Sequence, residues 1–434
     1  MKGRGPNFEA GSARLATCRQ AIALIGEARA SNFEDDPVGA RRVRVLVFVN
    51  HYLPGFRGGG ALRSIVNLVD SLGDEIDFRI VTSDRDLGES KGYQGVLVDG
   101  WQQVGKARVF YSSAKLQRFC GILRLLRERS YDVLYINSAF HPVFAVLPLA
   151  IRRLGLVRGV ATIVAPKGEF SPGALRIRKG KKELFLTLSR SIGLYRGVIW
   201  QVTDGLERGD LIAALGMGGS RDAVKVVEAR DIVLARGGEA TRSVRGKEPG
   251  RLRAVFLSRI APKKNLLGAV SMLKDLQGDV SLCVFGPIED KEYWSLCEAA
   301  IRLLPRNVVV RYRGEVEPAG VRRMFEDHDL FLFPTHGENF GHVIHEALVA
   351  GCPVLTSTAT PWRDLEKVGA GWDVPLEDGE RFKKVLQRCV DMGTKEHALV
   401  RSSAAAFARE KLEDPSVLTA NRMLFRTAVT SGKD

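Results

Sequence analysis

Hydrophobic positions along the 434-residue chain fall into two series of short apolar runs, separated by stretches with helical spacing. In the first series a valine-rich run at 43–49 is followed by a helical pattern at 61–72, and further apolar runs lie at 78–81, 133–136 and 160–164. Continuous runs of this length are typical of parallel strands buried on both faces. Because they alternate with helical segments, they predict βαβ units and a doubly wound sheet.

A second series of the same kind follows a polar, glycine-rich stretch at 236–250, in which 237–249 is the predicted hinge. The predicted strands of this series are 254–257, 281–285, 308–312, 330–333 and 354–356. Its predicted helices are 266–276, 293–304, 319–327, 342–350 and 379–392. The predicted fold class is therefore α/β, with two Rossmann-like, doubly wound domains facing a cleft at the carboxyl ends of their strands, where ligands bind in open α/β sheets.

The predicted organisation comprises an N-terminal extension (1–40), a first domain (41–236), a second domain (237–412) and a C-terminal helix (413–434) that packs back on the first domain. The extension has no core-strand pattern, and charged residues interrupt any signal-peptide core. No apolar run approaches the roughly 18 residues of a spanning helix. The six cysteines form no metal or disulfide pattern, which favours reduced thiols in a cytoplasmic protein.

Net charge is +15, and the excess lies in the first half of the chain. Residues 41–235 hold 30 Lys and Arg against 18 Asp and Glu, a surplus of 12, whereas the remainder from 236 holds 30 against 27. Such a field favours an anionic partner: a phosphorylated substrate, nucleic acid or an acidic membrane surface. Basic, leucine-containing segments at 118–129, 151–158 and 175–182 fit either anionic lipid head groups or ordinary exposed helices.

Two glutamates lie in the segment PTHGENFGHVIHEAL at 334–348, which joins a buried strand to a helix. Glu338 falls in the loop, and Glu346 falls on the second turn of the helix, with seven residues between them. Free N–H groups at a helix N-terminus suit an anion or a sugar hydroxyl, and two acceptor carboxylates suit a polyhydroxylated ligand. The alternative is that Glu338 caps its own helix and Glu346 is a surface residue.

Two cations follow the first predicted strand of the second domain, and a glycine-rich turn follows the first predicted strand of the first domain. Arg259 stands at the carboxyl end of the strand at 254–257, and Lys264 lies five residues later. A guanidinium and an ammonium at this place suit a diphosphate, although two solvated loop cations would look the same. Arg57 and three glycines at 58–60 stand between the first strand and its helix. Glycines there let the backbone approach a phosphate.

The combination of glycine-rich turn, R-x4-K and E-x7-E, in this order, resembles the retaining, nucleotide-sugar-dependent glycosyltransferases of family 4 (group 1), which have the GT-B fold. Stretches at 167–175, 285–294 and 360–365 are similar to segments of bacterial polysaccharide and lipopolysaccharide members. The resemblance runs from about residue 43 to residue 426.

This resemblance implies that Arg259 and Lys264 hold the donor diphosphate and stabilise its leaving charge. Glu338 would bind hydroxyls of the transferred sugar, and Glu346 would accept hydrogen bonds from the ribose. Phe340 would lie beside the sugar and the phosphate.

The remaining donor contacts that the resemblance implies are made by the main chain. Gly341 would border the phosphate at the helix start, and Gly59 and Gly60 would bring the first domain's backbone to the diphosphate when the cleft closes. Gly314 and Val316 would lie where the base is bound.

The chain departs from the family pattern at two places. Asn137 stands where many relatives carry a histidine, and His141, four residues later, is a candidate acceptor-side residue together with Asn137. The asparagine-containing loop that commonly precedes the hinge is replaced by residues 227–231.

No metal or other cofactor is predicted to be required. The D-x-D sequences at 84–86 and 327–329 are interpreted as a solvated loop and a strand edge. His342, His345 and Glu346 could share one helix face, but their order differs from a zinc-protease motif and no third zinc ligand is evident.

The resemblance thus implies a transferase that moves a sugar, with retention, from a UDP- or GDP-sugar to a glycan acceptor, expected to be lipid-linked, in surface polysaccharide synthesis. The enzyme would be cytoplasmic, with a peripheral contact to anionic membrane. Two other hypotheses stay open: a basic two-domain binding protein for nucleic acid or membrane, and a sugar-nucleotide epimerase or hydrolase on the same fold. No aromatic-rich basic motif of the RNA-binding kind is present, so nucleic acid is not an expected partner.

Overall fold

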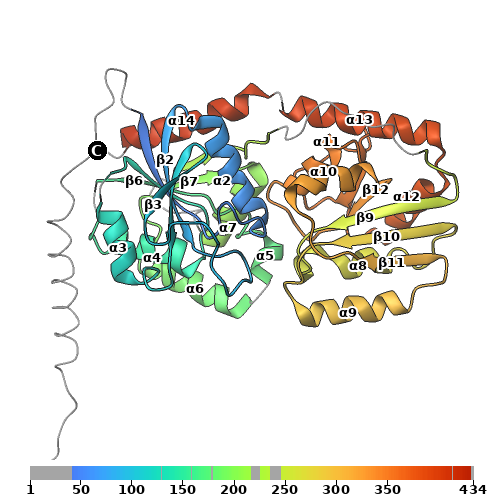
Figure 1. Ribbon diagram of the computed structural model, residues 1–434, viewed down its shortest axis with the longest axis horizontal. Helices are drawn as coiled ribbons and strands as arrows, with labels where there is room; N and C mark the ends of the chain where they lie inside the picture. The colour runs from blue at the N-terminus through green and yellow to red at the C-terminus, as the bar shows by residue number, and fades with distance from the viewer. Residues whose placement is uncertain are drawn as a thin grey trace, which may run out of the picture.

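The computed structural model describes residues 42–128, 130–157, 159–176, 179–216, 225–234, 246–412 and 414–431. They form two α/β domains that lie side by side, each around a mostly parallel sheet (Figure 1). The predicted fold class is therefore confirmed. The extension predicted at 1–40 and most of the predicted hinge lie outside the described residues.

The first domain is built on an eight-stranded sheet in the order β3-β4-β2-β1-β5-β6-β7-β8. All neighbouring strands run parallel except β3 and β4. The strands are β1 (Val43–Phe48), β2 (Ile76–Ser83), β3 (Trp101–Val104), β4 (Ala107–Ser112), β5 (Val133–Ile136), β6 (Ala161–Val164), β7 (Ile199–Val202) and β8 (Lys225–Glu228). The helices are α2 (Gly59–Leu72), α3 (Phe119–Arg127), the π-helical turn η1 (Pro142–Val146), α4 (Leu147–Arg153), α5 (Pro172–Arg176), α6 (Lys179–Ser191) and α7 (Gly205–Leu215).

Helices cover both faces of this sheet and divide its core in two. One apolar cluster joins α2 and the C-terminal helix α14 (Pro415–Ser431) to one face, and the other joins α3, α4, α6 and α7 to the opposite face. The strands β1 and β5 contribute buried side chains to both clusters, which explains their uninterrupted apolar sequence.

The second domain carries a six-stranded, all-parallel sheet in the order β11-β10-β9-β12-β13-β14. The strands are β9 (Arg251–Leu257), β10 (Asp279–Phe285), β11 (Val308–Tyr312), β12 (Leu330–Phe333), β13 (Val354–Ser357) and β14 (Gly371–Val374). The helices are the 3-10 turn η2 (Pro262–Lys264), α8 (Leu266–Ser271), α9 (Lys291–Arg302), α10 (Pro318–Glu326), α11 (His342–Val349), α12 (Gly379–Asp391) and α13 (Thr394–Leu412). The helix predicted at 266–276 is shorter than expected, because α8 ends at Ser271 and turns follow.

The chain returns to the first domain through its last two helices (Figure 1). After α13 crosses the second domain, α14 packs against the first sheet. The ring of Phe425 lies 5.9 Å from that of Phe78 and 5.8 Å from that of Tyr135. Arg422 forms a bidentate ion pair with Glu75. The C-terminal helix therefore completes the core of the first domain and links the two domains a second time.

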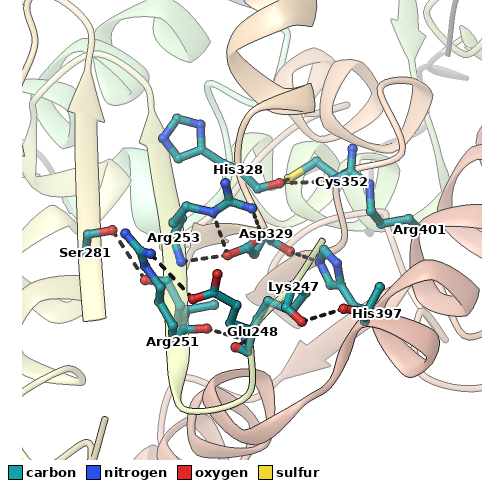
Figure 2. A network of polar contacts seen from close by, with 12 residues as sticks. Lys247, Glu248, Arg251, Arg253, Ser281, His328, Asp329, Cys352, His397 and Arg401 are labelled. Atoms are coloured by element: carbon teal, nitrogen blue, oxygen red, sulfur yellow. Dashed lines mark hydrogen bonds and ion pairs between the residues drawn. The ribbon is translucent and has the colours of Figure 1, made fainter. Parts of the chain in front are cut away.

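Asp329, part of the second D-x-D sequence, belongs to a polar network that joins β9, β12 and α13 (Figure 2). Its carboxylate accepts hydrogen bonds from the backbone N–H of Arg253 at 2.9 Å and from its guanidinium at 2.7 and 3.1 Å. The imidazole of His397 contacts the Asp329 carbonyl at 2.9 Å, and Arg401 donates to the His328 carbonyl at 2.8 Å. This network is structural, and it occupies the end of the sheet where β9 and β12 begin.

Among the described residues, none of the helices combines the length and the apolar character needed to cross a bilayer.

Candidate functional site

Glu338 and Lys264 form a buried ion pair at the carboxyl end of the second sheet. The Nζ of Lys264 donates to Oε1 of Glu338 at 2.5 Å, and the hydroxyl of Thr335 donates to the same oxygen at 3.2 Å. Both charged side chains are mostly buried, with exposed fractions of 13% and 12%. Burial opposes ionisation of Glu338, but Lys264, Lys263 and these hydrogen bonds outweigh it and lower its pKa. Glu338 is thus a carboxylate that faces a cation, and it does not cap α11.

The loop after β9 gathers further positive charge beside this pair. Arg259 contacts Glu289 and keeps its side chain partly exposed, while Lys264 ends the short turn η2. Burial lowers the pKa of Lys263, and the like charges of Lys264, Arg259 and Lys182 lower it further against the opposing effect of Glu338. Lys182 comes from the first domain, so cations from both domains converge on one place. Such a cluster has the electrostatic character of an anion site.

The start of α11, close to these cations, is not capped by a side chain of the described residues. Its N-cap is Gly341, which has φ of +79° and supplies no capping side chain. The positive φ favours glycine here, and a Cβ would also be crowded, at 3.1 Å from Ile344 and 3.3 Å from Trp362. The carbonyl of Phe340 accepts a hydrogen bond from the Trp362 indole at 2.6 Å, which fixes the approach to the helix. Ile344 and His345 donate their N–H groups to the Gly341 carbonyl at 2.8 and 3.3 Å, so the N–H groups of His342 and Val343 are the ones that suit a phosphate or a hydroxyl oxygen.

The glycine-rich turn of the first domain lies against the start of α11. Gly59 begins α2 with φ of +64°, and a Cβ at Gly60 would lie 3.4 Å from the ring of His342. One turn further along each helix, Arg63 on α2 pairs with Glu346 on α11 at 3.3 Å. The N-termini of two helices, one from each domain, therefore point into the same space.

A second ionic contact joins the domains at the edge of this cleft. Arg57 donates to Glu315 at 2.6 Å and also contacts Glu89. Glu315 lies between Gly314 and Val316, in the loop after β11, and the Gly314 carbonyl accepts a hydrogen bond from the N–H of Gly286 at 2.8 Å. Through Glu315, the structure thus brings the loop that holds Gly314 and Val316 close to Arg57 of the first domain.

Asn137 and His141, the acceptor-side candidates, occupy structural positions in the loop after β5. Asn137 donates through Nδ2 to the Ala61 carbonyl in α2 at 2.8 Å, while its buried Oδ1 has no partner among the described residues. The Nδ1 of His141 accepts the N–H of Phe144 at 3.1 Å and so caps η1. Burial, followed by the charge of His51, lowers the pKa of His141 to about 4. His141 is therefore neutral at pH 7.

A buried chain of charged residues that the sequence analysis missed crosses between the domains. Lys167, after β6, pairs with Asp231 at 2.5 Å, and Nε2 of His342 at the start of α11 lies 3.4 Å from the other oxygen of Asp231. Burial disfavours the Asp231 carboxylate, but Lys167 and His342 outweigh burial and lower its pKa to about 2. Asp231 lies in the segment that replaces the family's asparagine loop, and only that departure could have drawn attention to it.

Asn339 and the turn at Lys167 and Gly168 continue this interdomain contact. A Cβ at Gly168, where φ is +72°, would approach Cβ of Asn339 to 3.0 Å. The buried carboxylate of Glu207 accepts the N–H groups of Gly168 at 2.6 Å and of Thr203 at 2.7 Å. Thr203 in turn donates to the Asn339 side chain at 3.2 Å. The first domain therefore supports the loop that carries Glu338.

A separate cavity of about 1000 Å³ opens between the domains on the far side of this contact. Its walls include Asn339, Phe340, Asp231 and Trp362, together with the ends of α13 and α14. Arg259, Lys264 and Glu338 do not line it. The cavity therefore includes Phe340 of the predicted donor site but none of its three charged residues.

The first D-x-D sequence was assigned wrongly to a solvated loop. Asp84 and Asp86 are both buried. Asp86 accepts the N–H groups of Phe56 at 2.9 Å and Arg57 at 3.3 Å, so it shapes the segment that leads to the glycine-rich turn. Its pairing with a loop 30 residues earlier is a tertiary contact that local sequence does not reveal. Among the described residues no cluster of three or more candidate metal ligands is found.

Comparison with known proteins assigns the second domain to a family. Residues 239–405 match the family model "Glycosyl transferases group 1". The match to this family covers the second domain, and the fold of the whole chain is that of the GT-B glycosyltransferases among the solved structures.

Two curated relatives and one crystal structure illustrate the similarity. The phosphatidyl-myo-inositol mannosyltransferase of Mycobacterium leprae is 28% identical over 185 residues, which is 41% of this chain and about half (47%) of the relative. An uncharacterised 41.2 kDa protein in the cps region of Klebsiella pneumoniae is 23% identical over 337 residues, covering 76% of this chain and 86% of the relative. The Anabaena protein HepE, in complex with UDP and glucose, superposes with a TM-score of 0.63 at 16% identity, over 90% of this chain and 100% of that one.

Proposed function

We propose that this protein transfers a sugar, with retention of anomeric configuration, from a nucleotide diphosphate sugar to a glycan acceptor in surface polysaccharide synthesis. The observation that carries the proposal is the arrangement of Lys264, Glu338 and the start of α11, with Arg259 beside them and the glycine-rich turn of α2 opposite. Cations and free helix N–H groups suit a leaving diphosphate, and a buried carboxylate among them suits sugar hydroxyls.

In this proposal Arg259, Lys264 and the N–H groups of α11 stabilise the charge that develops on the leaving diphosphate. Lys263 adds to the same field, because burial and then the neighbouring cations destabilise its charge, which a bound anion would stabilise. Glu338 binds hydroxyls of the transferred sugar, and Glu346 binds the ribose once Arg63 has moved away from it.

For retention, the acceptor hydroxyl attacks the anomeric carbon from the face that the diphosphate leaves. The bond between C1 and the diphosphate oxygen breaks, the bond between C1 and the acceptor oxygen forms, and the acceptor proton passes to the leaving phosphate. Neutral His141 is held as a helix cap, so it is not assigned this proton.

The donor is proposed to be a UDP- or GDP-sugar and the acceptor a lipid-linked glycan. One relative is named as a phosphatidyl-myo-inositol mannosyltransferase, and another as a protein in a cps region. Both names support such an acceptor, as does the excess of basic residues in the first domain. The proposed location is the cytoplasm, at the membrane surface.

A thermal-shift panel of UDP, GDP, ADP and their sugar conjugates tests the donor site, because a ligand that binds only the native state stabilises it by mass action. We expect a selective rise in Tm for one nucleotide. Turnover is then followed by two products, free nucleoside diphosphate and sugar attached to lipid extract, in equal amounts. Free sugar instead of glycolipid would indicate a hydrolase, an isomerised donor would indicate an epimerase, and no response to any nucleotide would contradict the proposal.

A further inference from the structure

The segment after β8 that carries Asp231 is fixed to three elements of the first domain. Three buried amide side chains donate hydrogen bonds to the backbone carbonyls of this segment. They are Gln201 of β7, Asn67 of α2 and Asn421 of α14, which bond to the carbonyls of Ala229, Ile232 and Arg230 at 2.9, 2.9 and 2.8 Å. Buried polar groups whose hydrogen bonds are satisfied rigidify the structure around them. Asp231 therefore stands on a rigid part of the first domain.

The Asp231 carboxylate contacts one cation of its own domain and one side chain of the second domain. One oxygen pairs with Lys167 at 2.5 Å, and the other lies 3.4 Å from Nε2 of His342. The side chains of Asp231, Lys167 and His342 are 5%, 10% and 9% exposed, so these contacts are shielded from water. Lys167 has a φ of +52°, which is unfavourable for lysine, and its ion pair with Asp231 helps to hold it there.

The imidazole of His342 is held by groups of the first domain. Its Nε2 atom is buried and has no hydrogen-bond partner among the described residues, so the Asp231 carboxylate 3.4 Å away is the group that stabilises it. A buried ring N–H without any acceptor would be unfavourable. The glycine-rich turn encloses the same ring, because a Cβ at Gly60 would lie 3.4 Å from its Cδ2 atom. The first domain therefore sets where this ring lies.

His342 is also the first residue of α11, whose start is not capped by a side chain of the described residues. Its backbone N–H is one of the two that suit a phosphate, and its imidazole branches from the same Cα. A shift of the ring would therefore turn this N–H relative to a bound phosphate. Asp231 is thus linked to the anion site through a single residue of the second domain.

We propose that Asp231 and His342 are positioning residues for the transfer: Asp231 holds the imidazole of His342 and thereby directs the first N–H groups of α11 at the distal phosphate of the donor. The inference rests on the proposed function, because it takes the start of α11 as the phosphate site. The distal phosphate carries the oxygen that leaves C1, so the placement of these N–H groups matters most there. Lys167 neutralises Asp231, so the contact adds no net negative charge beside the phosphate.

Binding of a nucleoside diphosphate and of its monophosphate tests the proposal, because the monophosphate lacks the distal phosphate. The probes are UDP with UMP, or GDP with GMP, for the base that raises the Tm of the full chain, and titration calorimetry gives the ratio of the two Kd values. H342L removes the contact with Asp231, whereas H342Q keeps an N–H donor at the end of its side chain, and both retain the backbone N–H. We expect the preference for the diphosphate to fall about tenfold in H342L and to recover in H342Q.

Two further variants separate positioning from the general joining of the domains. K167M/D231L removes both members of the ion pair without changing net charge, and it should lower the preference as H342L does. Adding H342L to it should cause no further fall, because the same contact is already lost. T203V is the matched control: it removes the interdomain hydrogen bond from Thr203 to Asn339, which does not involve His342, and it should keep the preference.

The outcomes distinguish this proposal from the proposed function. An unchanged preference in H342L or in K167M/D231L, no recovery in H342Q, or a fall in T203V equal to that in H342L would overturn the positioning role and leave the donor site standing. If the unmodified protein shows no preference for the diphosphate, the proposed function is contradicted and the positioning role falls with it. H342L and K167M/D231L remove the contact independently, so failure of one variant to fold leaves the other as the test.

Discussion

Lys264→Met removes the cation of the Lys264–Glu338 ion pair, which we propose to lie at the centre of the donor site. The variant is expected to lose both stability and turnover. Removing one member of a buried pair leaves the other charge uncompensated, which costs about 3–5 kcal/mol. Glu338 keeps the field of Lys263 and its bond from Thr335, both of which lower its pKa. The loss in free energy of unfolding is therefore expected at the lower end, about 3 kcal/mol.

The double variant K264M/E338Q isolates the pair. Replacement of a buried ion pair by neutral groups of similar size is often nearly neutral for stability. We therefore expect K264M and E338Q each to be clearly destabilised, the double variant to recover most of the loss, and the coupling energy of the cycle to exceed about 2 kcal/mol. Urea unfolding followed by tryptophan fluorescence reports on the second domain through buried Trp362 and Trp372.

Turnover should not recover with stability. All three variants lose a group that we propose to contact the donor, so kcat/KM is expected to fall by about 100- to 1000-fold in each. Lys274→Ala, an exposed lysine beyond the end of α8, serves as the control and should change neither property. Additive stability losses, or a double variant that regains turnover, would refute the assignment of this pair to the donor site.

Three further predictions follow from other contacts. Burial lowers the pKa of His345 to about 4 from an ordinary value near 6.5, so the unfolded chain takes up the proton first and stability falls as pH drops from about 6.5 to about 4. H345L should remove up to about 3 kcal/mol of that loss, measured by unfolding at both pH values. An unchanged dependence of stability on pH would contradict this prediction. Arg63 forms an ion pair with Glu346, and a partly exposed pair contributes about 0–1 kcal/mol. R63M should therefore tighten nucleotide binding by no more than about fivefold in titration calorimetry, whereas weaker binding would indicate that Arg63 itself contacts the donor. Turnover should persist in excess EDTA, and activity that is lost and then restored by Mg²⁺ or Mn²⁺ would show a metal requirement.

The strands that were predicted most accurately are those buried on both faces. The runs at 133–136 and 330–333 coincide with β5 and β12, because a central parallel strand has no polar face to blur its pattern. The strands β3 and β8 lie at the edges of the first sheet and carry polar or partly exposed residues, so the apolar pattern did not reveal them.

The candidate site was foreseen where it lies within local motifs and missed where it depends on tertiary contacts. Glu338 and Lys264 could be named from sequence, but their direct pairing joins residues 74 positions apart. The pairing of Lys167 with Asp231 spans 64 positions and then reaches His342 in the other domain. Local spacing does not encode such contacts. His141, proposed from its place after β5, turned out to cap η1, a backbone need that sequence did not show.

A crystal structure of the protein with the nucleotide sugar that raises its Tm tests the central claim most directly. The account predicts the diphosphate within hydrogen-bonding distance of Arg259, Lys264 and the first N–H groups of α11, with the sugar hydroxyls on Glu338. A nucleotide bound instead in the separate cavity lined by Trp362 and Asp231, with the Lys264–Glu338 pair untouched, would contradict it.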